Sequence, residues 1–397
     1  MKALVVSSKY QPEYSGSGLR AHNTYKRLST SYNIEYEVVA NSTNELGNKK
    51  YIFDGKEVNR IAPPFPVRRK KGMIRKFLVA AKAVWEFFYS WQYIKNRTND
   101  FDYLHTFGNS WSVTFLTLYF KYQRKPVIRE LCNDVDTPYY PIHLEPMIKK
   151  VFINDKNMIV AISKKLEELA LDFGAKNVWL RPNPVDEARF FVDYENRLKF
   201  RHQLTKFHES DIILCHVANY IDRKNQLFSV ELLAALPDKF KLVLAGPLKN
   251  EETNYFNRVN DRIKELDLEA RVEVKTGFVE NFDEYIKASD VFLFPSKSEG
   301  LGTPLLEAQA CGIPVVSNKI EGISDTVIHW GQGGFYLPLI VDKWKDAVLD
   351  SLEISKWNLI ANSKIILGES STKKIDKLYV EKVQSLLNSN HKSNTYD

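Results

Sequence analysis

The stretch from Phe294 to Val316, FPSKSEGLGTPLLEAQACGIPVV, decides the fold of this chain. It ends a strand of buried type, passes through a loop with Gly300 and Gly302, and enters a helix that Thr303 is placed to cap. The two glycines allow the backbone to approach a ligand closely, and the amides at a helix start favour an anion. A well-capped helix alone would not explain Glu299 beside this glycine pair. We therefore predict an anion-binding loop at the carboxyl end of a strand.

Strands and helices alternate on both sides of this stretch. The first half opens with an apolar strand at 3–6, a glycine loop at 16–18 and a helix at 19–28. The second half opens again with a strand at 212–217, and further helices and strands follow it. Such alternation is typical of parallel sheets with helices on both faces. We predict an α/β protein of two Rossmann-like domains. The predicted divisions are 1–185, 186–368 and a C-terminal helix and tail at 369–397.

Length and composition agree with two globular domains. The chain has 397 residues, of which 44% are hydrophobic and 26% charged, and this balance excludes disordered and collagen-like classes. Cys132, Cys215 and Cys311 are too few for a disulfide framework and form no CxxC spacing, which favours a reducing, cytoplasmic compartment. The apolar run after Lys2 is too short for a signal peptide. The uncharged run 103–120 carries too many polar groups for a membrane span, so we expect strand, loop and helix there.

The charge is distributed unevenly along the chain. The net charge is +7, but residues 1–200 hold 32 basic and 21 acidic side chains, whereas the remainder has an acidic excess. This asymmetry predicts that the first domain faces something anionic, with nucleic acid, a membrane surface and a phosphate-bearing substrate as candidates. No motif typical of nucleic-acid-binding modules is present, so we do not expect a nucleic-acid partner.

The quoted stretch resembles the signature of retaining glycosyltransferases of family 4, which have the GT-B fold. The match consists of two glutamates with seven residues between them, the glycine pair, and an alanine-rich helix that ends in Gly-Ile-Pro-Val-Val. Its flanks agree as well, since LVLAGP at 242–247 and VKTGFV at 274–279 resemble the family's strand turn and base-holding loop. The resemblance implies two Rossmann-like domains whose parallel sheets face a central cleft. It also implies that the helix around Tyr379 crosses back onto the first domain.

The resemblance assigns roles to residues of the second domain. Glu299 would lie by the donor sugar, and Glu307 would hydrogen-bond the nucleotide ribose. Lys224 matches the family's diphosphate-binding lysine, and a cation suits that place because negative charge grows on the diphosphate as its bond to the sugar breaks. We therefore predict Glu299 and Lys224 as catalytic residues. The predicted nucleotide-sugar-binding residues of this domain are Asn219, Arg223, Gly277, Val279, Gly300, Leu301, Gly302, Thr303 and Glu307.

Two of these positions depart from the family pattern or have a simpler explanation. Asn219 stands where the family often has an arginine, and Arg223 is the candidate to supply the missing charge. The alternative for Arg223 and Lys224 is a solvated turn. In the first domain, Gly16 and Gly18 resemble the family's loop near the donor phosphates, and they complete the predicted nucleotide-sugar-binding set.

The acceptor side is less defined in the sequence. Many members of the family carry a histidine in the loop after the strand at 127–128, but this chain has none there. Glu130, Asn133 and Asp134 remain as alternatives, and His105 is a further candidate with a structural role as its alternative. Asp134-Val135-Asp136 is a DxD-like pair, which would suggest manganese in other glycosyltransferases. In a GT-B chain, cations and helix amides are expected to hold the diphosphate instead, so we expect no metal and no cofactor.

A basic and aromatic stretch covers residues 68–91. Arg68, Arg69, Lys70 and Lys71 precede a helical segment rich in phenylalanine and tryptophan. Basic residues beside aromatic helical residues are typical of a helix that lies on an anionic membrane surface. A buried helix with a solvated basic lead-in fits the same residues. The stretch predicts possible peripheral contact with the inner face of a membrane.

The sequence thus predicts a retaining, metal-independent, hexosyl-type glycosyltransferase. It would move a sugar from a nucleotide-diphosphate sugar to a glycan or lipid-linked acceptor, in the assembly of surface polysaccharide or glycoconjugates. A nucleotide-sugar epimerase of the same fold and a non-catalytic sugar-nucleotide-binding protein are the alternatives. A glycogen-type phosphorylase would need a cofactor lysine and a much longer chain. The donor sugar, the acceptor and the linkage stay open.

Overall fold

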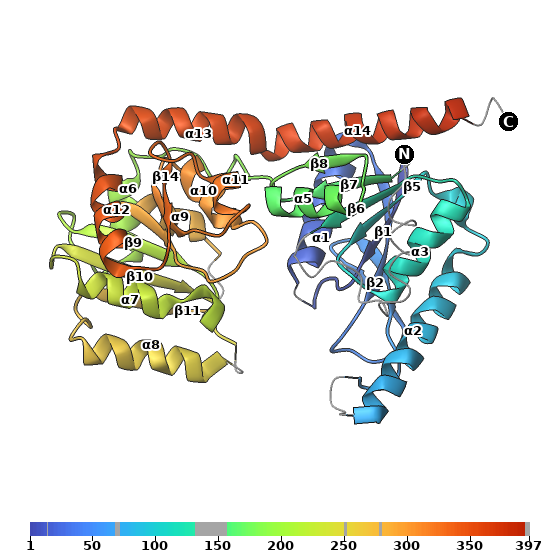
Figure 1. Ribbon diagram of the computed structural model, residues 1–397, viewed down its shortest axis with the longest axis horizontal. Coiled ribbons are helices and arrows are strands. Elements are labelled where there is room, and N and C mark those ends of the chain that lie inside the picture. Colours follow the sequence, from blue (N-terminus) through green and yellow to red (C-terminus); the bar gives the residue numbers. More distant parts are fainter. Residues whose placement is uncertain (14, 68–71, 132–156, 250–251, 278–279, 394–397) are drawn as a thin grey trace. The chain divides into compact units, whose positions relative to one another are not determined.

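Figure 1 shows a computed structural model of the protein, which describes residues 1–13, 15–67, 72–131, 157–249, 252–277 and 280–393. The chain forms two compact units. The first unit consists of Met1–Arg181 together with Asp376–Asp397, and the second unit consists of Pro182–Ile375. Each unit is an α/β domain built on a largely parallel sheet, as the alternation of strands and helices predicted.

An eight-stranded sheet forms the centre of the first unit, in the order β3-β4-β2-β1-β5-β6-β7-β8. Neighbouring strands are parallel except β3 and β4, which pair in antiparallel fashion at one edge. The strands are β1 (Lys2–Ser7), β2 (Glu35–Asn41), β3 (Lys49–Phe53), β4 (Lys56–Ile61), β5 (Tyr103–Phe107), β6 (Val127–Leu131), β7 (Asn157–Ala161) and β8 (Val178–Leu180).

Helices cover both faces of this sheet because its central strands are apolar on both sides. In β1, Ala3 and Val5 join one buried cluster, whereas Leu4 and Val6 join another. The first cluster receives side chains from α1 and α14, and the second from α2 and α3. The run 103–120 is therefore strand, loop and helix, as predicted. The helices are α1 (Gly16–Tyr32), α2 (Gly72–Ile94), α3 (Trp111–Tyr122), α5 (Lys164–Asp172) and α14 (Thr372–Ser393), with a 3-10 turn η1 (Thr98–Asp100).

The helix α14 is held in the first unit by polar contacts as well as by apolar packing. The Tyr379 hydroxyl lies 2.9 Å from His105 Nδ1 and 2.9 Å from the Tyr25 hydroxyl, and all three side chains are buried. Near the start of this segment, Arg27 donates two hydrogen bonds to the Asp376 carboxylate, at 2.7 and 2.9 Å. Residues far apart in the sequence thus complete one domain.

The second unit contains a six-stranded parallel sheet in the order β11-β10-β9-β12-β13-β14. Its core combines strand side chains with helical ones such as Trp344, which is fully buried. The strands are β9 (Ile212–Val217), β10 (Phe240–Gly246), β11 (Val272–Thr276), β12 (Val291–Phe294), β13 (Val315–Asn318) and β14 (Gly334–Leu337). The helices are α6 (Arg197–Leu204), α7 (Gln226–Ala234), α8 (Thr253–Glu265), α9 (Phe282–Ala288), α10 (Thr303–Ala310), α11 (Ser324–Val327), α12 (Val341–Glu353) and α13 (Lys356–Ser370), with a 3-10 turn η3 (Asp222–Lys224).

Two local expectations were wrong. Thr303 is the first residue of α10, and Gly302 is its N-cap; the Thr303 hydroxyl instead accepts a hydrogen bond from Asn183 Nδ2 at 2.7 Å. Gly16 and Gly18 do not lie in a loop before a helix, because α1 already begins at Gly16 and Ser15 caps it by accepting from the Gly18 amide. A side chain at position 18 would come within 2.5 Å of the Lys9 carbonyl oxygen, so this glycine permits close packing.

Candidate functional site

The candidate site lies where two neighbouring strands of the second unit end. β9 and β12 pair in parallel, with Val291 opposite Leu214 and Phe292 opposite Cys215. Their carboxyl ends therefore meet at the same edge of the sheet, which is where parallel α/β sheets bind ligands. β9 leads into the turn η3, and β12 leads into the loop before α10. The predicted residues Arg223 and Lys224 lie on the first of these segments, and Glu299 lies on the second.

The loop after β12 is shaped by a glycine in the left-handed region. Gly302 has a φ of 84°, and a Cβ atom there would lie 3.1 Å from Leu305 Cδ1 and 3.2 Å from Phe294 Cε1. A larger residue would be strained in its backbone and crowded by these side chains. Gly302 therefore turns the chain sharply into α10, and Glu299 and Gly300 before it are partly buried. Leu301 is buried.

The turn after β9 is fastened to the same loop. Asn225 ends η3 in the left-handed region and donates from Nδ2 to the Pro295 carbonyl oxygen at 3.3 Å. The Lys297 amide donates to the Arg223 carbonyl oxygen at 2.8 Å. These bonds fix the backbone positions of Arg223 and Lys224 relative to Glu299.

Two cations converge on one carboxylate oxygen in this site. Lys224 Nζ lies 2.6 Å from Glu299 Oε1, and Arg223 Nη1 lies 2.9 Å from the same atom. Arg223 also donates to the Ser298 carbonyl oxygen at 2.6 Å. The sequence-predicted residues Glu299, Lys224 and Arg223 are thus brought together. Arg223 lies on an exposed turn, as the alternative expected, whereas the Lys224 side chain is sheltered.

The two cations differ in their exposure to solvent. The Lys224 side chain is 14% exposed and the Arg223 side chain 44%. Lys224 Nζ also lies 4.9 Å from the centre of the Phe294 ring. Burial lowers the pKa of Lys224, and the nearby Glu299 carboxylate opposes that shift. The site therefore holds one sheltered cation and one screened by water, and charge is stronger where water is excluded.

Glu307 lies on α10 in a less exposed position than its place in the sequence suggested. It is the fifth residue of the helix, just past its first turn. Burial raises the pKa of its carboxyl group to about 8, with Arg189 opposing the shift and Asp283 adding to it. A carboxyl group in this state can both donate and accept a hydrogen bond.

His216 is a polar residue of the site that the sequence did not single out. It lies on β9, is fully buried, and places Nδ1 2.9 Å from the Ser229 hydroxyl. Its Nε2 atom is buried without a hydrogen-bond partner. Burial, together with the Lys224 charge, lowers the pKa of His216 to about 3, so the ring is neutral at physiological pH. The signal available was one histidine in the otherwise apolar strand IILCHV.

The remaining predicted donor residues occupy scattered places. Asn219 follows β9, and its carbonyl oxygen accepts from Gln226 Nε2 at 2.9 Å. Gly277 follows β11 with a φ of 108° and an exposed backbone. Gly16 and Gly18 belong to the first unit, where the Gly18 amide is already bonded to Ser15. Val279 lies outside the described residues.

Two of the predicted acceptor-side residues form a buried network in the first unit. Glu130 is an ion-pair partner of Arg181 and of Arg20, the latter at 3.4 Å, and its Oε1 lies 3.6 Å from His105 Nε2. Both residues are buried on neighbouring strands, and the two arginines hold the pKa of Glu130 well below its usual range against the effect of burial. Burial lowers the pKa of His105. Asn133, Asp134 and Asp136 lie outside the described residues, so contact between these positions and an acceptor stays a prediction.

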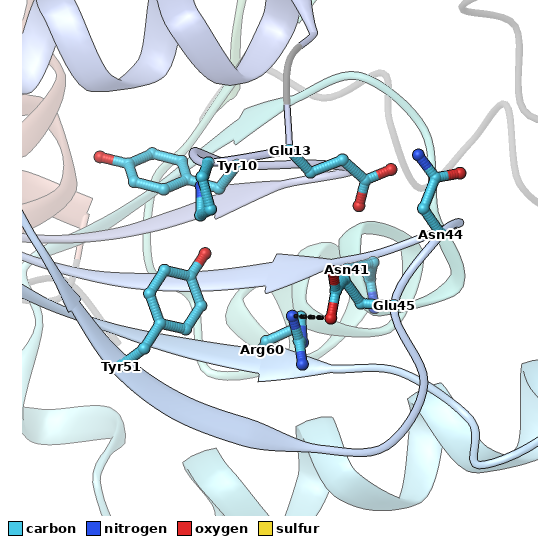
Figure 2. Close-up of a pocket in the computed structure, with 8 residues that line it drawn as sticks. Tyr10, Glu13, Asn41, Asn44, Glu45, Tyr51 and Arg60 are labelled. Atoms are coloured by element: carbon cyan, nitrogen blue, oxygen red, sulfur yellow. Dashed lines mark ion pairs between the residues drawn. The ribbon is translucent and has the colours of Figure 1, made fainter.

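A polar pocket of about 170 Å³ lies at the carboxyl ends of β1, β2 and β4 in the first unit (Figure 2). Glu13 projects into it from the loop after β1 and accepts hydrogen bonds from Ser42 and Thr43, while Lys9 Nζ lies 2.9 Å away. The pocket is lined by Tyr10, Pro12, Glu13, Asn41, Asn44, Glu45, Tyr51 and Arg60.

Two buried polar atoms of this pocket have no hydrogen-bond partner. Asn41 Nδ2 donates to the Ile61 carbonyl oxygen and to the Ser112 hydroxyl, both at 2.9 Å, which leaves Asn41 Oδ1 as an unused acceptor. Arg60 Nη1 pairs with Glu45 at 3.3 Å, as the dashed line in Figure 2 shows, whereas Arg60 Nε is an unused donor. Buried polar atoms without partners are rare, so Asn41 Oδ1 is an acceptor and Arg60 Nε a donor that the protein itself leaves unused.

Among the described residues, no three His, Cys, Asp or Glu side chains gather in a way that could hold a metal ion. Within the same part of the chain, no helix has both the length and the apolar character needed to cross a bilayer. The basic residues Arg68, Arg69, Lys70 and Lys71 lie outside the described residues, so their contact with a membrane surface stays a prediction.

Comparison with known proteins adds a family match for the second unit. Residues 197–383 match the family model described as Glycosyl transferases group 1. The capsular polysaccharide biosynthesis glycosyltransferase CapH of Staphylococcus aureus is 27% identical over 44% of this chain and 50% of its own length. An Escherichia coli UDP-Gal:alpha-D-GlcNAc-diphosphoundecaprenol alpha-1,3-galactosyltransferase is 26% identical over 51% of this chain and 54% of its own. The chain thus spans about half the length of these curated relatives.

A solved structure matches nearly the whole chain. Anabaena HepE in complex with UDP and glucose superposes with a TM-score of 0.69 at 18% identity, covering 97% of this chain and all of that one. This likeness shows the fold, and the two Rossmann-like domains are therefore those of the GT-B architecture. The predicted fold is confirmed.

Proposed function

We propose that this chain, whose second unit matches the group 1 glycosyl transferases, is a retaining glycosyltransferase that uses a nucleotide-diphosphate sugar. It transfers a hexose-type sugar to a glycan or lipid-linked acceptor in the assembly of polysaccharide or glycoconjugate. The observation that carries this proposal is the convergence of Lys224 and Arg223 on Glu299 at the shared carboxyl edge of β9 and β12. Cations held at that edge are suited to a diphosphate.

The two cations would stabilise the leaving group. When the bond between the sugar's anomeric carbon and the diphosphate breaks, negative charge grows on the diphosphate oxygens. In the free protein Glu299 holds both cations in place, so they need little rearrangement to meet phosphate oxygens. The same charge could be neutralised by a metal ion, but here two protein cations are already in position, which supports metal-independent transfer.

Glu299 and Glu307 would act on the sugar and the nucleotide. Glu299, whose Oε1 contacts both cations, would lie by the donor sugar, as the family resemblance implies. The half-buried Glu307 carboxyl would hydrogen-bond the ribose hydroxyls, as the family resemblance implies. As the bond between the anomeric carbon and the diphosphate breaks, the acceptor hydroxyl oxygen would form the new bond on the face that the diphosphate leaves, which retains the configuration. The hydroxyl proton would pass to an oxygen of the departing diphosphate.

The pocket in the first unit would bind a sugar unit of the acceptor. Both of its carboxylates are paired with cations, Glu13 with Lys9 and Glu45 with Arg60, so a neutral ligand suits it better than an anionic one. A hydroxyl group can donate to Asn41 Oδ1 and accept from Arg60 Nε. A cavity of about 150 Å³ admits a benzene ring, so a pocket near 170 Å³ has room for a six-membered sugar ring.

Calorimetry with a panel of nucleotide sugars tests the proposal, followed by transfer assays with the donor that binds. Wild-type protein is expected to bind one donor, and Glu299→Gln is expected to lose most transfer while retaining the fold. Lys241→Ala is the matched control, because Lys241 is a similarly sheltered lysine of the same unit that pairs with Asp211 at 3.8 Å. Binding without transfer would instead indicate a sugar-nucleotide-binding protein. A changed donor sugar without any acceptor would indicate an epimerase.

A further inference from the structure

The His216 side chain is buried with one of its two ring nitrogens unused. His216 is the last residue but one of β9, the strand that leads into η3, and none of its surface is exposed. Its Nδ1 atom lies 2.9 Å from the Ser229 hydroxyl on α7, whereas its Nε2 atom has no hydrogen-bond partner among the described residues. A buried polar atom without a partner is uncommon and calls for an explanation. Packing alone gives none, because an apolar side chain would fill the same space without leaving a polar atom unpaired.

Lys224 has hydrogen-bond donors to spare. Its ammonium group carries three N–H donors. Within the described ranges, the hydrogen-bond acceptor of Nζ is Glu299 Oε1 at 2.6 Å, which takes one of them. The side chain is only 14% exposed, so bulk water reaches the remaining donors in part. The donor that Lys224 leaves over and the nitrogen that His216 leaves over are therefore complementary.

His216 and Lys224 lie within electrostatic reach of each other. Lys224 is in η3, the turn between the end of β9, which carries His216, and the start of α7, which carries Ser229. The Lys224 charge adds to burial in lowering the pKa of His216 to about 3. The ring is therefore neutral at physiological pH, and a neutral imidazole has a proton on one nitrogen and a lone pair on the other.

The hydrogen bond to Ser229 and the Lys224 charge together favour one tautomer of His216. With the proton on Nδ1, the ring donates to the Ser229 hydroxyl, and Nε2 is left with its lone pair. With the proton on Nε2, the ring would bury an N–H without an acceptor in the field of a nearby cation, where exclusion of water strengthens the repulsion. The first tautomer makes Nε2 an acceptor suited to an ammonium N–H.

We propose that His216 is a positioning residue for the transfer reaction, whose Nε2 accepts a hydrogen bond from Lys224 Nζ and holds this cation on the donor diphosphate. The proposal rests on the proposed function. In the free protein Lys224 is bonded to Glu299, and phosphate oxygens would take the place of that carboxylate when the donor binds. Nε2 then restricts the ammonium group while the bond to the sugar breaks. Because His216 is fully buried, it acts through Lys224 and does not touch the substrate.

Nitrogen NMR of the full chain tests the pairing without any donor. The probe is protein with isotopically labelled histidine, and the His216 signals are assigned by their loss in His216→Asn. We expect the proton on Nδ1 and the lone pair on Nε2. Lys224→Ala removes the charge that favours this tautomer and should move the Nε2 signal. Lys241→Ala should not move it, because Lys241 is a sheltered lysine of the same unit that pairs with Asp211.

Initial transfer rates with the donor that the panel identifies test the role in the reaction. His216→Asn keeps a polar atom in place of Nδ1 but removes Nε2. It should slow transfer about tenfold, the least that a hydrogen bond to a charged group is worth. His216→Gln offers an amide oxygen in place of Nε2 and should recover most of the rate. His329→Asn is the matched control, because His329 Nδ1 of the same unit lies 2.8 Å from Asn362 Oδ1, and its rate should equal that of the wild type.

A double-variant cycle separates positioning from a purely structural role. If Nε2 acts through Lys224, His216→Asn should add less than twofold to the loss in Lys224→Ala. An independent effect on the fold would again cost about tenfold. Circular dichroism checks that each variant is folded.

Four outcomes would overturn the proposal: a proton on Nε2, a wild-type rate in His216→Asn, equal rates in the Asn and Gln variants, or losses that multiply in the cycle. If any of these is found while the wild type transfers sugar, the inference fails and the proposed function stands. A wild type that transfers from no nucleotide sugar would contradict the proposed function itself, and the NMR measurement would still decide whether His216 and Lys224 are paired.

Discussion

Replacing Lys224 with alanine should reduce the transfer rate far more than replacing Arg223. Lys224 Nζ is 2.6 Å from Glu299 and its side chain is 14% exposed, so its charge acts where water is largely excluded. Loss of one such contact to a developing charge costs about 3 kcal/mol, or about a hundredfold in rate. Arg223 makes a 2.9 Å contact with the same oxygen but is 44% exposed. An exposed pair contributes about 1 kcal/mol or less, so Arg223→Ala should lose no more than about fivefold.

The assay is the initial rate of nucleoside diphosphate release from the donor that the panel identifies, at saturating acceptor. Lys241→Ala should behave as the wild type, which controls for the loss of a sheltered lysine. Equal losses in the Arg223 and Lys224 variants would refute the argument from burial. Rates within threefold of the wild type in both would remove the two cations from the mechanism.

Three further outcomes are expected. Glu307→Gln should stabilise the protein, and its advantage in free energy of unfolding over the wild type should grow by about 2 kcal/mol between pH 5 and pH 7. The reason is that folding raises the pKa of this carboxyl to about 8, so the folded wild type binds more protons than the unfolded chain over that window and loses stability as the pH rises. Chemical denaturation at both pH values measures the difference in unfolding free energy, and a difference that does not change with pH would contradict the raised pKa. Transfer should persist in excess chelator, since Lys224 and Arg223 meet the diphosphate; a strict manganese requirement would bring Asp134 and Asp136 back into the mechanism. Arg60→Lys keeps the charge opposite Glu45 but removes Nε, so it should raise the acceptor KM about fivefold without changing donor affinity; an unchanged acceptor KM would detach the pocket from acceptor binding.

The predictable parts of the site rest on sequence motifs and on the rule that parallel α/β sheets bind ligands at the carboxyl ends of their strands. Glu299 and Lys224 are 75 residues apart, yet each follows a strand of the same parallel sheet, so a common location was predictable. The N-cap of α10 was not predictable in this way. Threonine is a preferred N-cap residue, so the sequence pointed to Thr303. The left-handed Gly302, crowded by Phe294 and Leu305, takes that position instead.

Other features depend on tertiary contacts that a single sequence does not display. Asn41 and Arg60 are ordinary polar residues at the ends of strands, and only the bonds made by Asn41 Nδ2 and Arg60 Nη1 show which of their atoms remain unused. His216 is similar, since its neutral state follows from burial beside Lys224. The exposed face of α2 was ambiguous for the same reason: its residues are apolar nearly all round, and the position of Glu86 decides which side is buried.

The attachment of α14 has a consequence for the order in which the protein can fold during synthesis. Tyr25 and His105 are translated early, but their partner Tyr379 leaves the ribosome only after the whole second unit has been made. Domains generally fold as units during translation. The second unit, although it lies later in the chain, can therefore complete its folding first. The first unit has to wait, with part of its apolar sheet face uncovered, until residues 376–387 emerge, and chaperones would have their longest opportunity to engage the nascent chain there.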